Sequence, residues 1–267
     1  MKTARLVTAV VLAALALACE DDKKKELLSK TETKDSGAAI PSALLSAVAA
    51  AESSAAPPPK PPKECGATIV YDDPDLEAEL RLKAQKPKDK NPEPLTAADL
   101  AKITSVNIAA KKSLDEIDPC IFPKLVNLKH LYLPPGKYRD LTPIANLTKL
   151  ESLRASISEV EDVKPLEKLV LLDRLDLGRT HVRDITPLGT LVNITELQLD
   201  DTQVKDITPL SKMKKLEKLS IKGTLVTDVS PLKDLTKLKS LNAAGTALTN
   251  LDVLQPLMGR GLKVSTN

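Results

Sequence analysis

The sequence predicts a solenoid of stacked coils in the α/β repeat class, with parallel strands on a concave face and short 3-10 or single-turn helices on a convex face. Five prolines recur every 22 residues: Pro143, Pro165, Pro187, Pro209 and Pro231. Leu, Ile and Val form columns at the same interval. Aromatic residues make up only 1% of the 267 residues. A core so poor in rings has to be built from aliphatic side chains stacked coil upon coil.

The main apolar column marks one strand in each coil. It consists of Leu131, Leu153, Leu175, Leu197, Leu219 and Leu241. Successive side chains of a strand point to opposite faces, so these leucines point inward and their neighbours point outward. Proline suits the first position of a short helix, where its missing N–H costs nothing. We therefore expect a short helix at each proline, capped by the residue before it: Thr142, Thr186, Thr208 and Ser230.

Two polar columns accompany the apolar ones. Ser158, Thr180, Thr202, Thr224 and Thr246 form the first, which we expect to be a buried hydroxyl ladder that satisfies backbone groups. Asp140, Asp162, Asp184, Asp206, Asp228 and Asn250 form the second. One carboxylate per coil favours turn capping, and calcium coordination is the alternative.

The repeat pattern resembles a known family. It reads L-x-x-L-x-L-x-x-T-x-V-x-D-I-T-P-L-x-x-L, most clearly over residues 172–191. It resembles bacterial leucine-rich repeat proteins of the 22-residue internalin-like type, and the resemblance covers about residues 95–267. The resemblance implies a leucine-rich repeat solenoid with a helical N-terminal cap, and it implies binding of a protein or peptide by the concave face. It names no partner.

Atypical segments flank the coils, as a finite stack requires. We expect residues 64–104 to form the cap, with a helix starting near Pro74 and a second helix capped by Thr96. Residues 105–267 hold the repeats and a C-terminal cap. Val106 and Ile108 predict the first strand, in an irregular coil. Leu262 to Val264 predicts the last strand, one residue out of frame. This alignment places Lys263 in the same outward column as Tyr132 and Asn242.

The N-terminal residues predict export. Residues 1–18 combine Lys2 and Arg5 with an apolar run too short to span a bilayer, which is typical of a signal peptide. Ala16-Leu17-Ala18-Cys19 resembles the bacterial lipoprotein box, which implies lipidation of Cys19; cleavage without lipidation is the alternative. Residues 19–63 are rich in Ala, Ser and Pro and predict a disordered tether. We expect an exported protein of the bacterial cell envelope, anchored to the outer membrane or cell surface by lipid.

Two further cysteines remain if Cys19 is lipidated. Cys65 and Cys120 would then form a disulfide in an oxidising compartment, joining the cap to the first regular coil. Two free thiols are the alternative.

Composition disfavours several function classes. The 39 basic and 36 acidic residues are too balanced for a phosphate-binding surface to dominate, and the few rings offer no stacking surface for single-stranded nucleic acid. Two histidines and three cysteines leave few ways to build a metal site or a Cys/His nucleophile. We expect no enzyme, no cofactor and no nucleic-acid partner.

The outward residues of the strands predict a binding surface of mixed charge on the concave face. Tyr132, Arg154 and Arg174 are the expected anchors, because Tyr and Arg dominate interface hot spots. The full predicted set is His130, Tyr132, Arg154, Arg174, Asp176, Glu196, Gln198, Asp200, Lys218 and Lys222. We expect a monomer that binds an unidentified protein or peptide. The alternative is a structural cell-envelope lipoprotein with no concave-face ligand.

Overall fold

The computed structural model describes residues 63–66, 68–86, 93–111 and 113–266. The predicted signal peptide, Cys19 and nearly all of the predicted tether lie outside these residues. The described residues belong to one compact unit.

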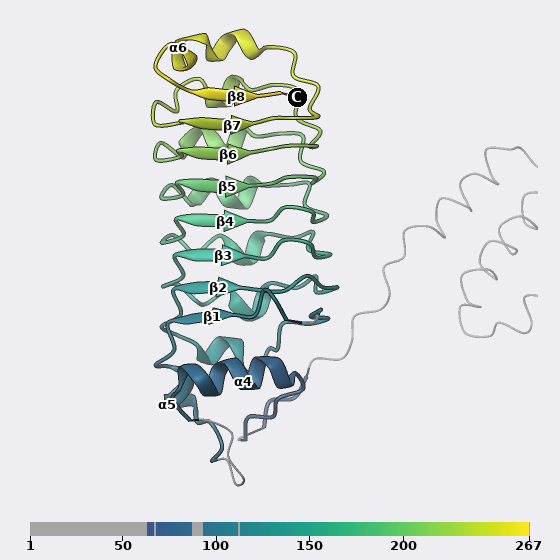
Figure 1. The fold of residues 1–267 in the computed structure, drawn as a ribbon, viewed down its shortest axis with the longest axis vertical. Coiled ribbons are helices and arrows are strands. Elements are labelled where there is room, and N and C mark those ends of the chain that lie inside the picture. Colours follow the sequence, from purple (N-terminus) through teal and green to yellow (C-terminus); the bar gives the residue numbers. More distant parts are fainter. Residues whose placement is uncertain (1–62, 67, 87–92, 112, 267) are drawn as a thin grey trace, which may run out of the picture. The chain divides into compact units, whose positions relative to one another are not determined.

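Eight parallel strands form a single sheet in which each strand pairs with the next in the sequence (Figure 1). The strands are β1 Ser105–Asn107, β2 His130–Tyr132, β3 Ser152–Arg154, β4 Arg174–Asp176, β5 Glu196–Gln198, β6 Lys218–Ser220, β7 Ser240–Asn242 and β8 Lys263–Ser265. From β2 to β7 each leucine of the main column pairs with the leucine 22 residues later. The predicted parallel stacking of this column is therefore confirmed.

Short helices return the chain behind the sheet. They are η1 Phe122–Lys124, η2 Thr142–Ile144, η3 Lys164–Leu166, η4 Thr186–Thr190, η5 Thr208–Lys212, η6 Ser230–Leu232 and η7 Leu251–Leu254, followed by the α-helical turn α6 Gln255–Met258. A proline lies in the first turn of η1 to η6 and of α6. The predicted link between proline and helix start is confirmed, because this residue suits a position without an intrahelical N–H partner.

The capping groups differ from those predicted. Thr142, Thr186, Thr208 and Ser230 are themselves the first helical residues, so the prediction that their side chains cap the helices was wrong. Instead the aspartate two residues before each first helical residue accepts its backbone N–H, at 2.7 to 2.8 Å. These aspartates are Asp140, Asp162, Asp184, Asp206 and Asp228. The predicted turn-capping role of this column is therefore confirmed at five coils.

The hydroxyl ladder is present. Ser158, Thr180, Thr202, Thr224 and Thr246 each donate a hydroxyl hydrogen bond of 2.6 to 2.9 Å to the carbonyl oxygen three residues earlier. Four of them are buried, and Thr246 in the last of these coils is partly exposed. Each bond satisfies a carbonyl in the turn after a strand, which lets the chain turn without an unpaired polar group in the core.

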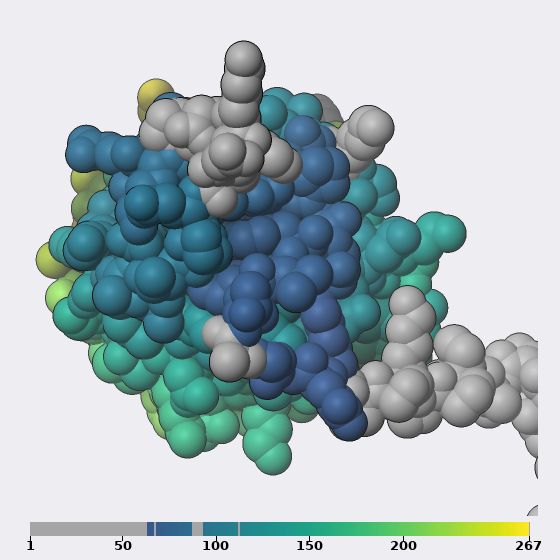
Figure 2. All heavy atoms as spheres, turned by 90° about the horizontal axis from the view of Figure 1, so that it is seen from below, coloured from purple at the N-terminus to yellow at the C-terminus, as the bar shows by residue number. Residues whose placement is uncertain are grey.

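The N-terminal cap consists of α4 Pro74–Lys83 and α5 Ala97–Leu100. Asp73 caps α4 by accepting the N–H groups of Asp75 and Leu76. Thr96 caps α5 in a capping box with Asp99, as predicted. Buried Leu76 and Leu80 lie on α4, which packs against β1. Figure 2 looks onto this end of the stack, where the dark blue atoms of the cap cover the coils behind.

The predicted disulfide between Cys65 and Cys120 is present, with the two Cα atoms 5.3 Å apart. Beside it, Lys63 forms ion pairs with Asp72 at 2.6 Å and with Asp118 at 2.8 Å. These three links hold the first described residues against the cap and against the turn that precedes η1. Cap and first coil are therefore crosslinked across a sequence separation of 55 residues.

The coil that contains β2 makes a close contact at Gly136. Gly136 pairs with Leu114 of the irregular first coil, and Lys137 donates its N–H to the Leu114 carbonyl at 3.0 Å. A Cβ atom on Gly136 would lie only 1.8 Å from that carbonyl oxygen. Glycine is therefore required where the irregular coil meets the regular ones.

We predict that Gly136→Ala lowers the free energy of unfolding by about 1 to 3 kcal/mol, because the added methyl group overpacks this contact. Urea unfolding followed by circular dichroism measures the change. Gly189→Ala is the matched control, since its Cβ would meet its nearest atom at an ordinary 3.5 Å. Equal stability of the two variants would contradict the steric argument.

We also predict that stability falls in acid through the capping aspartates. Hydrogen bonds from the hydroxyl groups and the backbone N–H groups of Thr186 and Thr208 lower the pKa values of Asp184 and Asp206. A carboxyl with a lowered pKa stabilises the fold above its unfolded-state pKa of about 3.9, and the effect is lost as the pH falls below about 4. In Asp184→Asn/Asp206→Asn the loss of stability between pH 7 and pH 3 should be smaller, because asparagine keeps the acceptor but does not titrate.

Urea midpoints at the two pH values provide the measurement. The control is Asp115→Asn/Asp234→Asn, because neither carboxylate makes a hydrogen bond within the described residues. The same change in midpoint for both double variants would argue against a special role of the capping column.

Candidate functional site

The outward residues of the strands form two main columns, which we call the sheet face. One column consists of Asn107, Tyr132, Arg154, Asp176, Gln198, Ser220, Asn242 and Ser265. The other consists of Ser105, His130, Ser152, Arg174, Glu196, Lys218, Ser240 and Lys263. Sequence reasoning placed Lys263 in the first column, which was wrong, because the longer final coil shifts its register by one residue.

A polar network fixes the centre of the sheet face. The carboxylate of Asp176 forms an ion pair with Nε of Arg154 at 3.2 Å and accepts a hydrogen bond from the hydroxyl of Ser156 at 3.1 Å. Its second oxygen accepts the backbone N–H of Gly178 at 3.0 Å. Arg154 also donates to Ser156, at 3.3 Å. Both carboxylate oxygens of Asp176 therefore have hydrogen-bond partners. The carboxylate orients the guanidinium group of Arg154, and the Arg154 side chain is 52% exposed.

A hollow of about 310 Å³ lies on the sheet face between β2 and β5. Six predicted residues line it: Tyr132, Arg154, Arg174, Asp176, Glu196 and Gln198. Ser152 also lines it and donates its hydroxyl to the phenolic oxygen of Tyr132 at 3.3 Å. Side chains from four adjacent strands therefore meet around one depression that combines a ring, two guanidinium groups and two carboxylates.

The other four predicted residues lie outside this hollow. Asp200 accepts the hydroxyl of Ser220 and the backbone N–H of Lys222, so its carboxylate serves the turn after β5. Lys218 lies 3.7 Å from Glu196 across neighbouring strands. Nδ1 of His130 is buried and has no hydrogen-bond partner within the described residues.

Sequence reasoning missed Ser152 and Ser156 as members of the site. Both were visible as outward residues, but a serine carries no signal of its own. Their importance arises from contacts: each hydroxyl links side chains on two neighbouring strands. The available signal was their position in outward columns: Ser152 lies one coil from His130 and from Arg174, and Ser156 lies two coils from Asp200.

Ion pairs border the sheet face at the residue before a strand. Lys129 contacts Glu151 at 2.8 Å, and Lys239 contacts Glu217 at 2.7 Å. The hydrogen bonds from these lysines lower the pKa values of Glu151 and Glu217. Both carboxylates therefore stay ionised at neutral pH, and the border carries charges of both signs.

The chemistry of the sheet face is recognition by hydrogen bonds and mixed charges. Within the described residues, no three or more His, Cys, Asp or Glu side chains are grouped so that they could hold a metal ion. Among these same residues, no helix is both long and apolar enough to cross a membrane.

Solved structures share this architecture. Internalin C2 of Listeria monocytogenes is 24% identical, with a TM-score of 0.61 over 77% of this chain and 100% of that one. The internalin InlF of the same bacterium is also 24% identical, with a TM-score of 0.60 over 74% of this chain and 63% of that one. A leucine-rich repeat protein of Leptospira interrogans is 16% identical, with a TM-score of 0.50 over 62% of this chain and 50% of that one.

No protein-family model and no curated protein matches the sequence significantly. The structural similarity therefore concerns the fold, and on that level it agrees with the sheet and its short helices. The chain has the leucine-rich repeat fold, as the repeat pattern predicted.

Proposed function

We propose that the chain is a non-catalytic binding module that recognises a protein or peptide through the sheet face. The hollow lined by Tyr132, Arg154 and Arg174 is the observation that carries the proposal. Tyr and Arg supply most of the binding energy at protein interfaces, and here they surround one depression. Stacked repeats present extended surfaces of this kind to their ligands.

The rigidity of the hollow supports the same proposal. Ordering a flexible side chain on binding costs about 0.5 to 1.5 kcal/mol. Arg154 is already oriented by Asp176 and Ser156, and the ring of Tyr132 is held beside Ser152. These two side chains are therefore already ordered in the free protein, so binding does not have to order them. Arg174 is 65% exposed, and its nearest carboxylate, that of Asp173, is 3.7 Å away, so its charge is available to a partner.

For the location we propose export and lipid anchoring at Cys19 in the bacterial cell envelope. The disulfide between Cys65 and Cys120 supports export, because such bonds persist in oxidising compartments. Residues 20–63 would then tether a monomeric binding module to the membrane, on the outer membrane or the cell surface.

We predict that a photoreactive residue at Gln198 or Ser220 captures a protein in intact cells. Arg154→Glu/Arg174→Glu should reduce the yield of the adduct at least tenfold, because two hot-spot arginines contribute more than about 1 kcal/mol each. Immunoblotting after ultraviolet irradiation measures the adduct. Arg139→Glu/Arg183→Glu is the matched control, since both arginines are exposed but lie in turns away from the sheet face.

An undiminished adduct in Arg154→Glu/Arg174→Glu would contradict recognition at the hollow. No adduct from either position, with normal expression, would instead favour a structural envelope lipoprotein whose sheet face has no ligand.

We predict that the protein incorporates labelled palmitate and that Cys19→Ser abolishes the label. Only a thiol at the start of the mature chain can be acylated in this way. The matched control Cys65→Ser/Cys120→Ser should keep the label, because these two sulfurs form the disulfide. Secretion of an unlabelled parent protein would show cleavage without lipidation.

A further inference from the structure

Positive charge is concentrated at the C-terminal end of the stack. Residues 212–263 contain ten Lys and Arg against four Asp and Glu, a net charge of +6, whereas the whole chain has a net charge of +3. The rest of the chain therefore carries a net charge of −3. The balanced overall composition conceals two regions of opposite sign, and the basic one coincides with the last coils.

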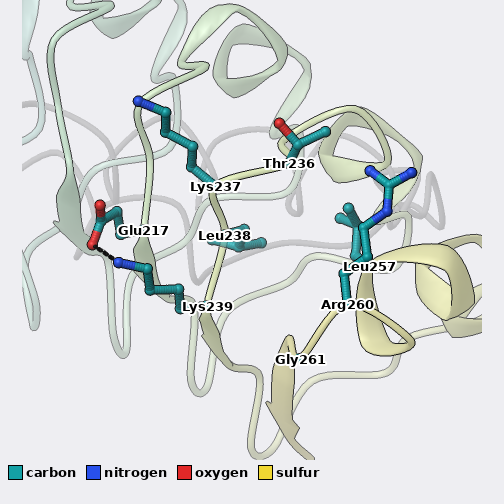
Figure 3. A pocket seen from close by; sticks show the side chains of 8 residues that line it. All are labelled: Glu217, Thr236, Lys237, Leu238, Lys239, Leu257, Arg260 and Gly261. Carbon is teal, nitrogen blue, oxygen red and sulfur yellow. Dashed lines mark hydrogen bonds and ion pairs between the residues drawn. The ribbon is translucent and has the colours of Figure 1, made fainter.

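Three lysines of this region act on the carboxylate of Glu217, and one of them, Lys218, also pairs with Glu196. Glu217 pairs with Lys239 at 2.7 Å, and the charges of Lys237 and Lys218 also act on it. Lys237 and Arg260 form no ion pair within the described residues. Figure 3 shows Lys239 directed toward Glu217, while Lys237 and Arg260 extend on either side of Thr236. We call Lys237, Lys239 and Arg260 the basic corner; the carboxylate of Glu217 offsets their three positive charges only in part.

A hollow of about 400 Å³ lies within the basic corner. Leu238 and Leu257 give it an apolar lining. The pairing of Ser240 with Lys263 places Gly261 at the repeat position of Leu238, which is Leu or Ile in each earlier regular coil. A Cβ atom on Gly261 would meet nothing within 4 Å. The hollow exists because the last coil lacks the side chain that fills this position elsewhere.

The adjacent strand β8 has an unpaired edge. It is the last strand in the order of the sheet, and no described residue pairs with its outer side. The N–H of Lys263 and the carbonyl of Ser265 face β7, at 2.9 and 2.7 Å from their partners. Backbone groups alternate in direction along a strand, so the N–H and carbonyl of Val264 face outward. An edge of this kind can take up an extended peptide.

We propose that the basic corner binds an extended acidic peptide segment of a partner protein. Carboxylates of the segment pair with Lys237, Lys239 and Arg260, an aliphatic side chain enters the hollow, and the backbone lies along β8. Charge complementarity selects the acidic character. The unpaired strand edge favours a peptide over the head group of an anionic lipid, which has no backbone to pair with it. The site is separate from the hollow on the sheet face and does not depend on it.

Fluorescence anisotropy with a fluorescein-labelled decapeptide of alternating Glu and Val tests the proposal on the full-length protein. We expect saturable binding that weakens as salt rises from about 50 to 200 mM, since the Debye length shortens. Lys237→Glu/Arg260→Glu should reduce the affinity at least tenfold. A peptide of alternating Lys and Val should not bind.

The matched control is Lys149→Glu/Arg179→Glu, which reverses the same charges elsewhere; Lys149 occupies the position of Lys237 four coils earlier. Circular dichroism verifies that both double variants fold. No binding of the acidic peptide, or an equal loss in both variants, would overturn the proposal. Binding to phosphatidylglycerol vesicles that requires Lys237 and Arg260, without peptide binding, would overturn it in favour of a membrane surface. Neither result affects the capture experiment at Gln198 and Ser220.

Discussion

Each coil of this protein buries its leucines only against the coils on either side, and this dependence governs the rest of the structure. Leu131, Leu153 and the equivalent residues up to Leu241 are 2% exposed or less, because every one is covered by its neighbours in the stack. Coils of equal length are needed to keep the column in register. The same requirement explains the near absence of rings, since a ring in every coil would overfill a circuit sized for aliphatic side chains.

Equal coils also require that each turn satisfies its backbone groups in the same way. After the strand, the hydroxyls of Thr180 and Thr202 donate to backbone carbonyl groups. Before the helix, the carboxylates of Asp184 and Asp206 accept backbone N–H groups. Both devices are local hydrogen bonds that each coil supplies for itself. Packing between coils can therefore be almost purely apolar, and outward side chains such as that of Arg174 remain exposed to solvent.

The sequence predicts this fold well because periodicity reports burial directly. The leucine column, the proline positions and the cap at Thr96 all follow from local residue patterns. Details that depend on counting across an irregular segment are less accessible: the extra residue before β8 moved Lys263 to another column. The site is predicted only in part for a related reason. Outward columns identify Tyr132 and Arg154, but the link through Ser156 to Asp176 depends on side-chain geometry that no repeat encodes.

Residues that depart from the repeat are informative, because such a change generally destabilises the packing between coils. Gly136 is required by the close approach of the Leu114 carbonyl, so that departure is explained by packing. Gly261 is explained by its backbone instead, because its φ of +102° is open to glycine but strained for other residues, while nothing lies within 4 Å of its Cβ position. A glycine there also leaves a hollow beside Leu238, although Leu238 itself stays buried at 4% exposure. The resulting hollow is bordered by lysines that outnumber their carboxylate. Like charges repel one another across this border, and a ligand that supplies carboxylates to it would relieve that repulsion.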